Sequence, residues 1–188
     1  ILFTVRMWQL IHLSMVNPQA MSFKLNLNQL QAFALPTHHI ISIQGEDSVV
    51  FLQSQLMNDV NSLVVGQWHY TGILNPQGRV LALFQLAKID REHFLIILAS
   101  LDPQWLVDYL KRFIFRSKVI INIEQDYQVQ GQFLDDKDTI DSALAITGDF
   151  NAGFILDIPD KSCTRKLLLS RTQVETNLQA IDQWHYLD

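Results

Sequence analysis

The chain contains very little cysteine and has no excess of positive charge. Cys163 is the one cysteine among 188 residues, so an internal disulfide bond is excluded. A chain without disulfides fits a reducing compartment, and we expect a cytoplasmic protein. The net charge is −5, so the chain lacks the overall positive potential that favours binding to duplex nucleic acid. We therefore expect no direct binding to duplex nucleic acid.

The N-terminal apolar run is too short to cross a membrane. It covers residues 1–16, whereas a transmembrane helix needs roughly 20 apolar residues. No small-residue cleavage site of the kind found in signal peptides follows the run. Met21 then opens an ordinary sequence. We therefore expect no membrane association, and we interpret residues 1–20 as a non-native or mis-started leader.

The short motifs that identify common enzymes and metal sites are also missing. The chain has no G-x-G-x-x-G, Walker loop, G-x-S-x-G, H-E-x-x-H or C-x-x-C motif. Lys161 and Arg165 favour a thiolate at Cys163, but no nucleophile signature accompanies it. His38 and His39 are neighbours at the start of a predicted strand, so their side chains point to opposite faces. We expect no metal site and assign no catalytic residue.

Strands and helices follow one another in an irregular order. Apolar residues at spacings of three and four between Val49 and Leu63 predict a helix that ends at Gly66. Asp102 and Pro103 predict the start of a second helix. Further helices are expected over 139–146 and from about residue 172, and strands at 39–43, 68–74, 80–88, 94–99, 119–123, 127–134, 154–158 and 166–170. Tight turns join several neighbouring strands, so the sequence predicts an α+β fold with mostly antiparallel sheets and packed helices.

A basic cluster follows the second predicted helix. It consists of Lys111, Arg112, Arg116 and Lys118. The helix dipole favours cations near a helix C-terminus, which gives these residues a structural role. The alternative is an anion-binding rim for a phosphate or for the carboxylate tail of a ligand.

The aromatic side chains are open to two interpretations. Tryptophan and its aromatic neighbours either pack in the core or form the walls of a site for a flat heteroaromatic ligand. The candidates for such walls are Trp68, Trp105, Trp184, Tyr70 and Phe84.

Several segments, taken in order, resemble the YgfZ family of folate-binding proteins, which are relatives of the glycine-cleavage aminomethyltransferase. Residues 45–60 are similar to the family block G-x-D-x-x-x-F-L-Q-x-Q-x-x-x-D-V. Residues 74–79, Leu-Asn-Pro-Gln-Gly-Arg, resemble its proline and glycine loop, and residues 110–119 resemble K-[KR]-[YF]-x-x-[RF]-[AS]-K-V. Gln183 and Trp184 lie near the position where the family places a tryptophan against folate. The resemblance covers about residues 28–188.

The resemblance implies a tetrahydrofolate-binding accessory protein that supports iron–sulfur cluster enzymes, including those that modify tRNA, without catalysing a reaction. Tetrahydrofolate is the implied cofactor, and iron–sulfur proteins are the implied partners. Trp184, His38, Arg79 and Arg116 are the implied binding residues.

The implied architecture is an aminomethyltransferase-like folate-binding domain with a ferredoxin-like middle domain. Residues 21–66 and about 125–188 are expected to form the folate-binding domain together, and this domain would be incomplete. Residues from about 67 to 124 are expected to form the smaller domain.

The chain departs from its aminomethyltransferase relatives at two positions. Those relatives carry an aspartate pair that supports C1 transfer, where this chain has Ala82 and Leu83. We therefore expect no aminomethyl transfer. The alternatives to a folate-binding accessory protein are a folate-dependent C1-transferase and a ligand-free protein interaction module.

YgfZ proteins also carry a later K-G-C-Y-x-G-Q-E motif, which does not occur up to Asp188. We expect an N-terminal fragment with an exposed apolar patch.

Overall fold

A computed structural model describes residues 31–134, 144–158 and 165–187. The expected leader at 1–20 and Cys163 lie outside these residues. The strands are β1 (Phe33–Ala34), β2 (His38–Gln44), β3 (Gln67–Leu74), β4 (Val80–Asp90), β5 (His93–Ala99), β6 (Ile120–Ile123), β7 (Gln128–Phe133), β8 (Ile146–Asp149), β9 (Gly153–Ile158) and β10 (Arg165–Ser170). The helices are α2 (Ser48–Gln55), α3 (Pro103–Lys111) and α4 (Leu178–Leu187).

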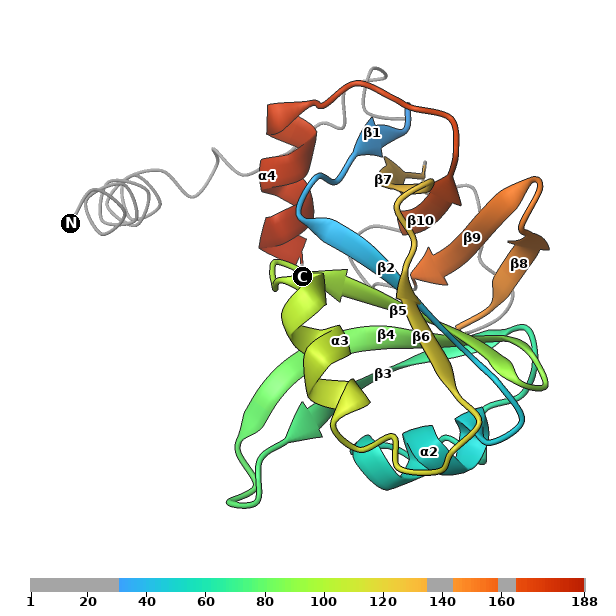
Figure 1. Cartoon of the computed structure of the whole chain (residues 1–188). Coiled ribbons are helices and arrows are strands. Elements are labelled where there is room, and N and C mark those ends of the chain that lie inside the picture. The colour runs from blue at the N-terminus through green and yellow to red at the C-terminus, as the bar shows by residue number, and fades with distance from the viewer. Residues whose placement is uncertain (1–30, 135–143, 159–164, 188) are drawn as a thin grey trace.

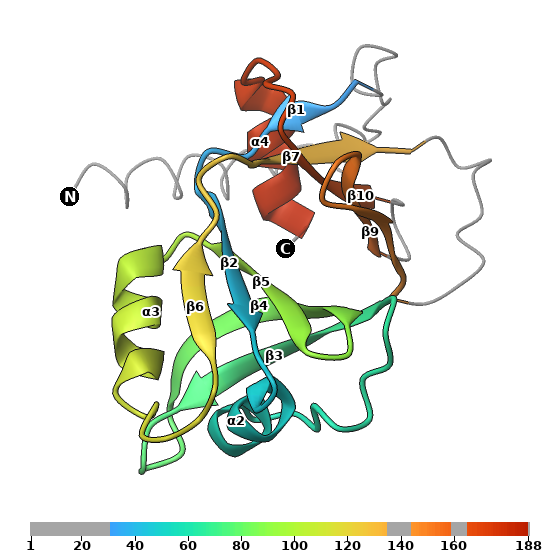
Figure 2. The ribbon, with the colours of Figure 1, turned by 45° about the vertical axis from the view of Figure 1, so that its right-hand side comes forward.

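The strands form two five-stranded sheets. Sheet A has the order β1-β7-β10-β9-β8, and sheet B has the order β3-β4-β5-β2-β6. All strand pairs in both sheets are antiparallel. Figures 1 and 2 show α2 and α3 on one side of sheet B, and sheet A with α4 on the other. The predicted α+β fold with antiparallel sheets and packed helices is confirmed.

Sheet B has a ferredoxin-like core with one added strand. In a ferredoxin-like β-α-β-β-α-β unit the first strand lies in the middle of the sheet. Here β2 takes that place between β5 and β6, and β3 is the extra strand at the edge. The sheets therefore do not divide the chain at residue 66, where the domain boundary was expected. The pairing of β2 with β5 and β6 brings residues 38–44 into the sheet of 67–123, and only β1 joins the later strands.

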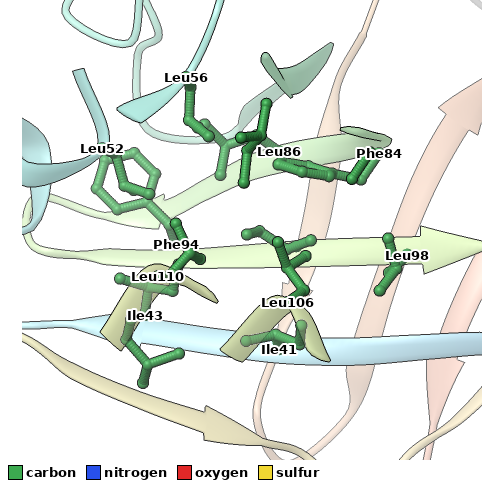
Figure 3. Close-up of a cluster of buried hydrophobic side chains, with 14 of the residues drawn as sticks. Ile41, Ile43, Leu52, Leu56, Phe84, Leu86, Phe94, Leu98, Leu106 and Leu110 are labelled. Atoms are coloured by element: carbon green, nitrogen blue, oxygen red, sulfur yellow. The ribbon is translucent and has the colours of Figure 1, made fainter. Parts of the chain in front are cut away.

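One face of sheet B packs against α2 and α3. Because side chains alternate along a strand, Ile41 and Ile43 of β2 point to this face. Leu106 and Leu110 of α3 lie one turn apart and reach the same core. Figure 3 shows these side chains together with Leu52, Leu56, Phe84, Leu86, Phe94 and Leu98. We call this cluster the helical-side core.

The other face of sheet B packs against sheet A. Ile40, Trp68, Leu95 and Ile97 lie on this face and are buried against sheet A side chains. Those side chains include Val129, Phe133, Phe154, Leu156, Leu167 and Leu169. The indole N–H of Trp68 donates to the Asp157 carbonyl oxygen at 3.2 Å, which links the two sheets directly. We call this second cluster the inter-sheet core.

Helix α2 is shorter than the prediction to Gly66. It ends at Gln55, and Leu56 has extended backbone with φ −100° and ψ 154°. The Gln53 side-chain oxygen accepts from the backbone N–H groups of Val60 and Asn61 at 2.7 and 3.1 Å. These bonds stabilise a folded loop in place of further helical turns. Val60 and Leu63 are buried all the same, so their apolar spacing reflects contact with the core and not a continuous helix.

Helix α3 begins where the sequence predicts. The Asp102 carboxylate accepts from the Gln104 backbone N–H at 2.9 Å, and Pro103 is the first residue of the helix. The helix expected over 139–146 lies mostly outside the described residues, and Ile146 begins strand β8.

Substitutions in and near the helical-side core test which side chains stabilise the fold. Leu106 has no exposed surface, whereas Val50 on α2 is 72 % exposed. Leu106→Ala leaves a cavity and is expected to lower the free energy of unfolding by about 2–5 kcal/mol. Val50→Ala, the control, should change it by less than about 0.5 kcal/mol. Urea denaturation of both variants measures the difference, and equal effects would contradict this assignment of the core.

His93 connects the β4–β5 turn to both β2 and sheet A. Its Nε2 atom lies 2.7 Å from the Ser42 hydroxyl oxygen, and its ring stacks on Phe150 with centroids 5.0 Å apart. Burial lowers the pKa of His93 below 6.5, and the nearby Asp90 carboxylate opposes this effect. The pKa of His69 is also lowered by burial, against the opposing charge of Asp59.

These two histidines make stability depend on pH in one direction. Above about pH 6.5 they are neutral in both the folded and the unfolded chain, so neither opposes folding. As the pH falls below this value the unfolded chain takes up protons first, and the folded state loses stability until the lowered pKa values are passed. We expect the free energy of unfolding to fall over this range. His93→Gln should reduce the slope, and the double variant with His69→Gln should reduce it further. A slope unchanged by both substitutions would assign the pH dependence to other groups.

Candidate functional site

Trp184 lies in the inter-sheet core where α4 packs on sheet A. Its side chain is 1 % exposed. Phe33 meets the indole edge-on with centroids 6.0 Å apart, and Phe133 lies at 5.8 Å. The Arg165 guanidinium carbon lies 4.8 Å from the ring centroid. Both faces of the indole are therefore enclosed by the protein, and Trp184 holds α4 against the sheet.

Gly131 makes the close approach of α4 possible. A Cβ atom at this position of β7 would lie 2.8 Å from Phe33 Cζ and 2.9 Å from Trp184 Cε3. Any side chain there would push these rings away from the strand. The aromatic contact between α4 and sheet A thus depends on a glycine in the middle of β7.

His38 lies beside the C-terminal end of α4, against the residue that follows Trp184. Its imidazole is buried at the start of β2 and stacks on the ring of His185, with centroids 6.2 Å apart and an interplanar angle of 27°. His185 itself is exposed. His38 therefore contacts the helix that contains Trp184, and the tryptophan itself is enclosed in the core.

Arg79 and Arg116 are both exposed and lie elsewhere. Arg79 ends the β3–β4 turn, in which the Asn75 side-chain oxygen accepts from the Arg79 backbone N–H at 2.9 Å. Figures 1 and 2 show this turn at the end of the molecule away from α4. Arg116 belongs to the segment between α3 and β6, which passes beside α2; there the Lys118 ammonium pairs with Glu46 at 2.6 Å. The four expected binding residues thus do not form one cluster.

Sheet A covers only part of the second face of sheet B. Strand register places Tyr70, Gln85, Ile97 and Ile40 in one row across the sheet. Ile40 and Ile97 are buried in the inter-sheet core, whereas Tyr70 is 50 % exposed. The next row contains Gly72 and Leu83 on β3 and β4, and Ala99 and His38 on β5 and β2. We call the exposed residues Tyr70, Leu83 and Ala99, with the mostly buried Gln85 between them and the buried His38 at the border, the uncovered surface.

The uncovered surface combines an aromatic ring, an aliphatic side chain and an amide. Tyr70 packs edge-on against Trp68 with centroids 5.2 Å apart, which orients its ring. The Gln85 amide nitrogen lies 3.4 Å from the Tyr70 hydroxyl, a weak donation to that oxygen. Leu83 is 60 % exposed and leans over Gly72, where a Cβ atom would lie 2.9 Å from its Cδ2 atom. A half-exposed ring beside an amide suits a flat ligand with polar edges.

Ala82 and Leu83 point to opposite faces of β4. Ala82 is buried in the helical-side core, and Leu83 belongs to the uncovered surface. A carboxylate at position 82 would be buried among apolar side chains, whereas one at position 83 would face a ligand on this surface. The uncovered surface contains no carboxylate, because position 83 is leucine.

The described residues were compared with three further kinds of site: a metal centre, a membrane span and a hollow in the surface. No group of three or more histidine, cysteine, aspartate or glutamate side chains in the described part of the chain is placed to hold a metal ion. None of the described helices is both long and apolar enough to span a membrane. An open hollow of about 820 Å³ is lined by Gln31–Phe33 and 174–179, and none of the four expected binding residues lines it.

Sequence reasoning named Tyr70 and His38 but missed Gln85 and His185. Alternation along the strands predicts that Tyr70 and Gly72 share a face, and likewise Leu83 and Gln85. The pairing of β3 with β4 then brings all four together. His185 carries no sequence signal, because its contact with His38 depends on how α4 packs.

Comparison with known proteins identifies close similarity in sequence and fold. The chain is 29 % identical over 160 residues to an uncharacterized protein of Haemophilus influenzae, covering 84 % of this chain and 52 % of that protein. It is 33 % identical over 97 residues to an iron–sulfur cluster assembly factor IBA57 homolog, mitochondrial, of Pyricularia oryzae, covering 50 % of this chain and 24 % of that protein. A homolog of the same description from Mycosarcoma maydis is 33 % identical over 108 residues, covering 50 % of this chain and 27 % of that protein. The chain thus spans about half or less of the length of these relatives.

The fold matches a solved aminomethyltransferase. The crystal structure of the glycine cleavage system aminomethyltransferase T from Bartonella henselae aligns with a TM-score of 0.62 and 14 % identity, over 82 % of this chain and 44 % of that one. This likeness confirms the expected aminomethyltransferase-like fold. The family model for the GCVT N-terminal domain matches residues 27–131, more than half of the chain. The chain therefore belongs to the GCVT N-terminal domain family, as the resemblance to folate-binding relatives of the aminomethyltransferase implied.

Proposed function

We propose that this protein binds tetrahydrofolate and supports iron–sulfur cluster enzymes, including enzymes that modify tRNA, without catalysing a reaction itself. Family membership supports a folate ligand, since the aminomethyltransferase shares the fold. The two fungal relatives described as iron–sulfur cluster assembly factors support a role beside iron–sulfur proteins. Within the family we assign the chain to the YgfZ-type branch.

The uncovered surface is the observation that carries the folate proposal. Tyr70 presents a half-exposed ring for stacking with a pterin, and the mostly buried Gln85 amide donates weakly to the Tyr70 hydroxyl. The exposed ring of His185, stacked on His38, borders this surface. Trp184 supports this surface from the core by holding α4, whereas Arg79 lies in the β3–β4 turn and Arg116 in the segment between α3 and β6.

A non-catalytic role is favoured over C1 transfer by the side chain at position 83. In the aminomethyltransferase relatives an aspartate pair supports C1 transfer, and at this surface a carboxylate at position 83 would be the one within reach of a ligand. Leu83 occupies the position that faces the surface, and Ala82 is buried on the opposite side of the strand. A cytoplasmic location goes with this role, on the basis of the single cysteine of the chain.

Binding of tetrahydrofolate to the full chain tests the proposal. Tyr70→Ala removes the stacking ring and is expected to weaken binding about tenfold, equivalent to ~1.4 kcal/mol. Tyr109→Ala, on the far side of sheet B, is the matched control and should leave the affinity unchanged. Isothermal titration calorimetry under reducing conditions measures both. Absence of binding by the unmutated chain, or equal affinity in both variants, would overturn the site.

Formation of formaldehyde or methylene transfer from a small amine by the unmutated chain would favour the C1-transferase. Intact partner binding in a chain that binds no folate would favour the interaction module.

Substitution of Trp184 tests whether this residue contributes to stability or to ligand binding. Trp184→Phe removes volume from an enclosed position and is expected to lower the free energy of unfolding by about 0.5–3 kcal/mol. Trp105→Phe, at a partly exposed position of α3, should cost less than about 0.5 kcal/mol. Both variants should bind tetrahydrofolate like the unmutated chain at a temperature where they are folded. A large loss of affinity without loss of stability in Trp184→Phe would show that the indole contacts the ligand.

A further inference from the structure

The outer side of α3 and the turn after it expose a row of aromatic rings. Trp105 and Tyr109 are four residues apart, so they lie along one side of α3, and the ring of Phe113 in the following turn continues the row. Trp105 and Phe113 are 37 % and 43 % exposed, and Phe115 in the following turn is 93 % exposed. A phenylalanine this exposed gains about 1.5–3 kcal/mol when a partner buries it. We call these four residues with Arg112 and Arg116 the α3 surface.

The rings of the α3 surface are ordered before any partner binds. The centroids of Trp105 and Tyr109 lie 5.5 Å apart with an interplanar angle of 25°, and those of Tyr109 and Phe113 lie 5.3 Å apart. The Arg112 guanidinium covers Tyr109 at 4.6 Å from the ring centroid. Because these side chains already support one another, burying them costs little conformational entropy.

The charge of this segment is opposite to that of the rest of the protein. Residues 103–119 contain four cations and one carboxylate, a net charge of +3. The whole chain has −5, so the remaining residues carry −8. Lys118 is paired with Glu46, whereas Arg112 and Arg116 are exposed beside the aromatic rings. This contrast favours a negatively charged partner and directs it to this face.

We propose that the α3 surface is a docking site for an acidic partner protein, which buries Phe115 in an apolar pocket and places carboxylates beside Arg112 and Arg116. Tryptophan, tyrosine and arginine are the residue types that dominate protein interfaces. A single-stranded nucleic acid is less well suited, because Arg112 and the neighbouring rings already occupy the faces on which bases would stack. Phe115 instead presents one protruding ring, which suits a pocket.

This site goes beyond the proposed folate function and lies on the opposite side of sheet B from it. Figure 2 shows α3 on one side of sheet B. Tyr70 alternates along β3 with residues of the helical-side core and shares the face of Trp68, so the uncovered surface is on the other side of the sheet. Folate and the acidic partner therefore bind without competing, and each can be lost without the other.

Selection of peptides from a random library displayed on phage against the full chain tests the proposal. Selected peptides are expected to combine aspartate or glutamate with an apolar side chain. Phe115→Ala and Arg116→Glu should each weaken the binding of the synthesised peptides at least about tenfold, and added salt should weaken it further. Leu178→Ala, at an exposed apolar residue away from α3, is the matched control and should have no effect. Phe115 makes no contact with the core, and circular dichroism confirms that the variants are folded.

Two further probes distinguish the other kinds of partner. The probes are a single-stranded oligouridine and phosphatidylglycerol vesicles. If no acidic peptide binds, and one of these probes binds tightly to the unmutated chain but not to Phe115→Ala, the proposal is overturned in favour of a nucleic acid or a membrane, respectively. Peptide binding that is equal in all variants would also overturn it. Tetrahydrofolate affinity in Phe115→Ala should equal that of the unmutated chain, so failure here is distinguishable from failure of the folate proposal.

Discussion

The central strands of sheet B are buried on both faces, and the rest of the structure depends on this. Its central strands β2 and β5 are nearly continuous apolar runs, such as Phe94–Leu98, in which every side chain is buried. One face needs the two helices and the other needs sheet A, because an apolar sheet exposed to water on either side would be unstable. The polar residue within β2, Ser42, is accommodated by its contact with His93.

The two layers that cover sheet B differ in extent, and this difference creates the candidate site. On the helical side, α2, α3 and the loop that follows α2 bury residues from Ile41 to Leu98. On the other side, sheet A covers the row of Ile40 and Ile97 but leaves Tyr70 and Leu83 exposed in neighbouring strands. The result is a partly apolar surface beside the C-terminal end of α4. Sites of this kind arise at the border between packed layers because the scaffold there is rigid and still accessible.

The two surfaces proposed for binding use the same sheet in different ways. The uncovered surface belongs to the strands themselves, so its residues are spaced by the register of β3, β4 and β5. The α3 surface belongs to a helix whose inner side is fixed by Leu106 and Leu110, and its outer side is free to carry aromatic and cationic residues. The rigid sheet between them keeps both surfaces in place, and it separates a ligand on one side from a partner on the other.

The sequence by itself determined the local elements and the family. Alternating and β-branched runs predicted eight of the ten strands of the described residues to within one or two residues, but neither β1 nor β8. Asp102 and Pro103 predicted the start of α3, because these signals act through the chain's own backbone. The family blocks were likewise readable in order along the chain. Tertiary structure alone decided where α2 ends, since Val60 and Leu63 are buried in a loop that Gln53 stabilises. It also decided that β2 joins the later strands of sheet B, that Trp184 is enclosed by Phe33 and Phe133, and that Arg79 and Arg116 lie away from His38. Each of these outcomes depends on contacts between residues far apart in the sequence, and local spacing contains no information about such contacts.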